Sequence, residues 1–178
     1  MSRLFHEFYI QPMNQVYIEM IAMFVIWTVA MLLLHGKARR IVAIVGAVLA
    51  LALVLVFTVL NRSSNGTREI SLIPFITFEN AKVQPELYRT MFMNVLLFMP
   101  FGLSLPFALN KKIWYNACMT ALIGLGLSIC VEVLQYVFCF GKSETDDVIM
   151  NLLGVLIGTF SFVICQMLSR TKIFKKGN

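Results

Sequence analysis

The chain alternates between long apolar segments and short polar connections. Five segments of 19 to 28 residues hold at most one charged residue each, and they are Val16–Leu34, Ile41–Leu60, Met91–Leu109, Ile113–Phe140 and Val148–Leu168. A helix needs about 20 residues to cross about 30 Å of hydrocarbon, and only helices and closed barrels satisfy their backbone there. The pattern therefore predicts an all-α bundle of five transmembrane helices, which forms a single membrane domain over residues 1–178.

Composition and the positions of the cysteines further narrow the class of protein that this chain belongs to. The chain is 59% hydrophobic and 13% charged, whereas a soluble domain has about 45–50% apolar and about 25% charged residues. The net charge of +6 does not indicate nucleic-acid binding, because the basic residues lie between apolar segments without interleaved aromatic residues. The four cysteines lie in apolar segments and form no CxxC pair. We therefore expect neither disulfides nor a metal or other cofactor.

The charge of the connections predicts the orientation of the bundle. Residues 35–40, 110–112 and 169–178 carry nine basic residues and no acidic one, and basic residues concentrate on the cytoplasmic side. We therefore expect the N-terminus outside, the C-terminus in the cytoplasm and an extracytoplasmic connection at 61–90. The apolar middle of that connection is too short to span, so it dips into the membrane interface, covers the bundle or forms a loosely packed loop.

In this topology the strongly polar side chains gather toward the outer ends of the helices. Residues three or four apart share a helix face, and an acidic group within hydrocarbon normally faces a bundle interior or a wet cavity. The predicted ligand-binding residues, all from three of the helices, are Arg89, Asn94, Glu132, Gln135, Asp146, Asp147 and Asn151.

Structural roles are alternatives for part of this set. Asp146 or Asp147 could cap the last helix and oppose its dipole. Asn151 could hydrogen-bond a neighbouring helix. Glu132 could be held neutral, or it could pair with Arg89 or another basic residue on the outer side. These alternatives stay open at the level of sequence.

Small residues indicate which helix faces lie inside the bundle. Gly124, Ser128 and Glu132 follow one another at four-residue spacing, and Gly154 and Gly158 repeat the arrangement on the last helix. Because small residues let another helix approach closely, we expect Glu132 to point inward.

Four motifs resemble those of a known family. The helical ones are residues 94–102 (N-x-x-x-F-x-P-x-G), 128–135 (S-x-x-x-E-x-x-Q) and 146–154 (D-D-x-x-x-N-x-x-G), and the loop contains the fourth, Ile-Pro-Phe at 73–75. In this order, over about half of the chain, they are similar to VanZ-like membrane proteins. Many relatives carry a basic residue and then an acid before the paired aspartates. Here that stretch is one residue shorter, with Lys142 and Glu144 as stand-ins.

The resemblance implies a multi-pass protein of the bacterial cell membrane, in a Gram-positive host. The founding member of the family is associated with reduced susceptibility to teicoplanin, a lipoglycopeptide that acts outside the membrane. The first hypothesis is therefore a cell-envelope protein, embedded in the lipid bilayer, that binds, excludes or alters an amphiphile. Its ligand would be the lipoglycopeptide or a lipid-linked wall precursor.

Three other functions remain as alternatives. Glu132 with Asp146 or Asp147 could act as acid and base in a membrane-embedded enzyme, or could bind a divalent cation with Asn151. Intramembrane acids also occur in small ion-coupled transporters. The last alternative is an accessory subunit whose outer face binds a membrane-protein partner.

Overall fold

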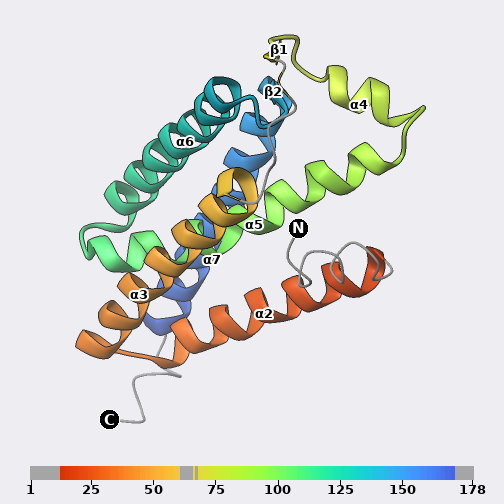
Figure 1. The fold of residues 1–178 in the computed structure, drawn as a ribbon. Coiled ribbons are helices and arrows are strands. Elements are labelled where there is room, and N and C mark those ends of the chain that lie inside the picture. The colour runs from red at the N-terminus through yellow and green to blue at the C-terminus, as the bar shows by residue number, and fades with distance from the viewer. Residues whose placement is uncertain (1–12, 61–65, 67, 171–178) are drawn as a thin grey trace.

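The computed structural model describes residues 13–60, 66 and 68–170 (Figure 1). The long helices are α2 (Met13–Leu33), α3 (Gly36–Leu55), α5 (Glu86–Leu109), α6 (Ile113–Phe138) and α7 (Thr145–Arg170). The shorter elements are the π-helix η1 (Val56–Leu60), the strands β1 (Glu69–Ser71) and β2 (Lys142–Glu144), and the helix α4 (Ile76–Ala81). Residues 61–65 and 67 of the predicted connection lie outside the described residues, as do residues 171–178.

Within the part of the chain that the structure describes, five helical segments are long and apolar enough to cross a membrane, when η1 is counted with α3. Many of their apolar side chains are exposed on the outside of the bundle, among them Ile26, Leu49 and Phe160. Such a surface suits contact with lipid. The predicted fold class, an all-α membrane bundle with five spans, is confirmed. Its orientation stays a prediction from the charge pattern.

Helix α5 lies at the centre of the bundle and contacts α2, α3, α6 and α7 (Figure 1). Its contact with α7 is made by glycines. A Cβ atom added at Gly102, Gly154 or Gly158 would lie 2.2 Å from a backbone carbonyl oxygen of the opposite helix. The backbones of α5 and α7 therefore touch, as small residues permit in membrane helix pairs.

Two left-handed residues end the central helices. Asn110 (φ 52°) follows α5, and Cys139 (φ 56°) follows α6, in the C-terminal conformation that closes many helices. Helix α6 therefore ends at Phe138, two residues before the end of the apolar segment. Asn116 fastens the α5–α6 turn, because its side chain accepts a hydrogen bond from Lys111 N and donates one to Lys111 O, both at 3.1 Å.

At the opposite end of α5 and α6 from this turn, two short parallel strands join parts of the chain that are far apart in the sequence. Strand β1 pairs with β2 in the register Glu69↔Lys142 to Ser71↔Glu144. We call this end of the bundle, where η1 and α6 finish and α5 and α7 begin, the loop end. Residues 69–81, which hold β1 and α4, are the β1–α4 segment. Because this segment pairs with β2, it is fastened to the bundle and is not a loosely packed loop.

Candidate functional site

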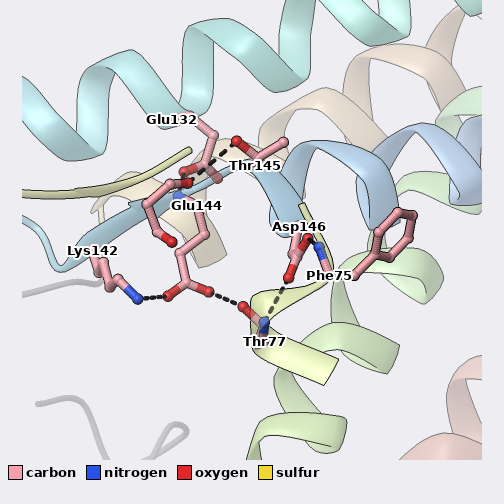
Figure 2. Close-up of polar contacts among 8 residues, drawn as sticks. Phe75, Thr77, Glu132, Lys142, Glu144, Thr145 and Asp146 are labelled. Atoms are coloured by element: carbon pink, nitrogen blue, oxygen red, sulfur yellow. Dashed lines mark hydrogen bonds and ion pairs between the residues drawn. The ribbon is translucent and has the colours of Figure 1, made fainter. Parts of the chain in front are cut away.

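Asp146 ties the β1–α4 segment to the start of α7. One of its carboxylate oxygens accepts a hydrogen bond from Phe75 N at 2.6 Å, and the other accepts one from Thr77 N at 2.7 Å (Figure 2). Phe75 has a left-handed backbone (φ 64°) and immediately precedes α4. Asp146, only 1% exposed, therefore caps α4, where a negative charge is favourable. In these contacts it serves another helix rather than its own.

The residues of β2, with Thr145 after them, add an ion pair and further hydrogen bonds at the loop end (Figure 2). Lys142 Nζ lies 2.7 Å from one carboxylate oxygen of Glu144, and the hydroxyl of Thr77 donates to the other at 2.7 Å. The hydroxyl of Thr145 donates to Ser71 O at 3.2 Å. The two residues that the resemblance offered as stand-ins, Lys142 and Glu144, thus form an ion pair, and Glu144 also accepts a hydrogen bond from Thr77 of α4.

Glu132 connects α6 to the same network. It is 6% exposed, and one of its carboxylate oxygens accepts a hydrogen bond from Glu144 N at 2.9 Å. Hydrogen bonds to an ionised carboxylate are stronger than neutral ones. This burial agrees with the expectation that Glu132 points inward. Ser128 and Gln135, on the same face of α6, are buried as well. Glu132 therefore joins α6 to β2, the strand that pairs with β1.

Two amide side chains beside Glu132 also bridge the helices. The Asn151 amide nitrogen donates to Ser128 Oγ at 2.9 Å, and the Gln135 amide nitrogen donates to Thr58 O of η1 at 3.0 Å. Asn151 thus takes the interhelical role that was an alternative at the level of sequence. The buried residues Ser128, Glu132, Gln135, Asp147 and Asn151 are called the polar cluster below.

Two acceptors in the polar cluster have no hydrogen-bond partner among the described residues. They are Gln135 Oε1 and Asn151 Oδ1, whose side chains are 1% and 2% exposed. The partner of Gln135 is a carbonyl oxygen, which only the amide nitrogen can serve, so the unpaired atom of Gln135 must be the acceptor. An unsatisfied buried polar group costs about 1–3 kcal/mol. Gln135 Oε1 and Asn151 Oδ1 can therefore each accept a further hydrogen bond.

The other predicted residues lie around this cluster. Asp147 is 6% exposed and precedes Asn151 by one turn of α7, and Asn94 of α5 is 8% exposed. Arg89 is half-buried near the start of α5, and its charge acts on Tyr17 of α2. Six of the seven predicted residues are thus buried at the loop end, and Arg89 is the one that is not.

Sequence reasoning did not select several residues that build the site. Thr58 contributes a backbone carbonyl from an apolar segment, which carries no signal in its side chain. Thr77 lies two residues after the Ile-Pro-Phe motif, and only that proximity could have drawn attention to it. Glu144 was considered as a stand-in, but its contact with Thr77 depends on the pairing of β1 with β2, which brings distant parts of the chain together.

Comparison with known proteins decides the family. The family model described as VanZ/LLP1 matches residues 43–166. This chain belongs to the VanZ/LLP1 family. Protein VanZ of Enterococcus faecium is 28% identical over 102 residues, which are 57% of this chain and 57% of that protein. The chain thus spans less than two thirds of that relative's length. No solved structure matches it.

The VanZ-like motifs meet one another in space. Gly154 of the D-D-x-x-x-N-x-x-G element approaches Val95 O, and Gly102 of the N-x-x-x-F-x-P-x-G element approaches Val155 O. Asp146 binds the backbone of the Ile-Pro-Phe motif at Phe75. The family match begins in α3, so α2 lies outside it. Much of the shared pattern therefore builds the α5–α7 contact and fastens the loop end.

Proposed function

We propose that this VanZ-like membrane protein uses the polar cluster at the loop end to bind an amphiphilic ligand of the bacterial envelope. By binding or altering that ligand, it lowers susceptibility to lipoglycopeptides such as teicoplanin. The ligand is either the antibiotic itself or a lipid-linked wall precursor. The proposal rests on two buried acceptors without a hydrogen-bond partner among the described residues, Gln135 Oε1 and Asn151 Oδ1. Each lies about one helical turn from a buried acid on the same helix face, Glu132 on α6 and Asp147 on α7.

The chemistry of this cluster suits such a ligand. Binding sites are commonly apolar with a few placed polar groups that orient the ligand. The cluster offers acceptors, and both candidate ligands carry peptide or sugar groups rich in N–H and O–H donors beside a long apolar chain. The charge pattern predicts that the loop end lies outside the cytoplasmic membrane, where these ligands occur. Membership of the VanZ/LLP1 family supports the same assignment.

The test expresses the protein in a sensitive Gram-positive host and measures susceptibility to teicoplanin and to vancomycin. Wild type, E132Q and the double variant E132Q/D147N are compared at equal membrane levels. The matched control is E79Q, which changes an exposed acid of α4 that lies outside the cluster. We expect protection by wild type and by E79Q, with loss in both cluster variants. Protection that survives in E132Q/D147N would contradict the assignment of this cluster.

A further inference from the structure

The β1–α4 segment has an exposed apolar tip. Ile70, Leu72, Ile73 and Phe75 are 55%, 71%, 65% and 58% exposed, and Pro74 between them is exposed as well. These residues form one short run in a connection that does not span the membrane. A contiguous exposed apolar patch marks an interaction surface, whereas single exposed apolar residues are common on any protein.

The backbone that carries this tip is held in place. Asp146 accepts hydrogen bonds from Phe75 N and Thr77 N on one side of the tip. On the other side, β1 pairs with β2, and Thr145 donates to Ser71 O (Figure 2). The polar backbone thus faces the protein while the apolar side chains are held away from it. The tip therefore presents its apolar side chains from a backbone that hydrogen bonds hold in place.

The position of the tip along the bundle indicates its depth in the membrane. Helix α5 has 24 residues and α7 has 26, which gives lengths of about 36 Å and 39 Å at 1.5 Å per residue. Both exceed the hydrocarbon thickness of about 30 Å, so their first turns reach the headgroup region. The β1–α4 segment contacts α5 through α4, and it pairs with β2 just before α7. Figure 1 shows β1 and α4 at this end of the bundle.

We infer that residues 70–75 are an interfacial anchor, which inserts its apolar side chains into the bilayer leaflet at the loop end. The occupant of the patch is lipid, because the segment lies at headgroup depth and is joined to spans whose outer surface is already apolar. Amphipathic elements at this depth bury their apolar side chains at the boundary between headgroups and acyl chains. Asp146 holds the anchor to α7. This inference does not depend on the proposed ligand of the polar cluster.

The test places a tryptophan on the tip of the full-length protein. L72W and I73W are prepared in a chain whose native residues Trp27 and Trp114 are changed to Phe. The proteins are reconstituted into vesicles of phosphatidylglycerol and phosphatidylcholine, with bromine on the acyl chains of the phosphatidylcholine near the headgroup. We expect bromine to lower the fluorescence of both variants by about twofold, because the tip lies at interfacial depth.

The control is N80W, because Asn80 is exposed on α4 outside the apolar run. We expect aqueous acrylamide to quench N80W and bromine to leave it unchanged. Tip tryptophans that acrylamide quenches and bromine does not would overturn the proposal. The same two quenching measurements are repeated on L72W in a chain that keeps Trp27 and Trp114. The quenching that L72W adds to that of the native tryptophans then tests the proposal even if the changes to Phe disturb folding. A further D146A substitution is expected to reduce bromine quenching of L72W, and unchanged quenching would overturn the role of Asp146.

Discussion

The α5–α7 contact and the loop end hold the same helices together by different physical means. At the contact, Gly102, Gly154 and Gly158 bring backbone against backbone, and the hydroxyl of Thr159 donates a hydrogen bond to Gly102 O at 3.2 Å. At the loop end, Asp146 and Glu132 reach across to backbone N–H groups of other segments. The first region sets the spacing of the helices. The second leaves two buried acceptors without a hydrogen-bond partner among the described residues, and the proposed ligand site lies there.

The largest effect is expected from an added methyl group at the α5–α7 contact. G154A places a Cβ 2.2 Å from Val95 O, so α5 and α7 must separate, and we expect stability to fall by about 1–3 kcal/mol. G126A on α6 is the matched control, because nothing lies within 4 Å of its Cβ. It should be neutral or stabilising by up to about 1 kcal/mol. Thermal unfolding in detergent measures both, and equal melting temperatures would contradict the close contact.

The next effect is expected from releasing the β1–α4 segment. D146A removes the acceptor of Phe75 N and Thr77 N, and each lost hydrogen bond costs about 0.5–1.5 kcal/mol. We expect amide hydrogen exchange at these two positions to accelerate at least about tenfold, while amides in the middle of α5 keep their rates. Exchange that is unchanged at Phe75 and Thr77 would show that Asp146 does not hold the segment.

A smaller effect on stability, with a large effect on function, is expected at Gln135. Q135L removes one hydrogen bond to Thr58 O but also one unpaired buried acceptor, so stability should change by no more than about 1 kcal/mol. Protection against teicoplanin should nevertheless be lost. Melting temperature and susceptibility are measured on the same variant. Full protection in a stable Q135L protein would remove Gln135 from the proposed site.

The smallest effect is expected at the ion pair of β2. Lys142 lies 2.7 Å from Glu144, but its side chain is 37% exposed, and partly solvated ion pairs contribute little. K142M should therefore lower stability by less than about 1 kcal/mol. A melting temperature that falls as far as that of D146A would show that the ion pair, rather than the Asp146 cap, holds α4.

The helices could be predicted from sequence because their length and apolar content are local properties of the chain. The residues that end them were harder to predict, since Cys139 adopts its left-handed conformation without a glycine to signal it. The inward face of α6 also followed from spacing, because Gly124, Ser128 and Glu132 repeat every four residues.

The tertiary partners of the polar residues could not be predicted in the same way. A cap for α7 was a reasonable local role for Asp146, but its partners Phe75 and Thr77 lie about 70 residues away. Such contacts depend on which segments the fold brings together, and no local pattern encodes them.

The most direct test of the proposed site is ligand binding by the purified protein in lipid nanodiscs. Teicoplanin and a lipid-linked wall precursor are added separately to wild type, Q135L and the control E79Q, and the affinity of each is measured. We predict that wild type and E79Q bind at least one of the two and that Q135L binds it at least about tenfold more weakly, a loss of about 1.4 kcal/mol. Equal affinity in Q135L and wild type, or no binding by wild type, would contradict the account.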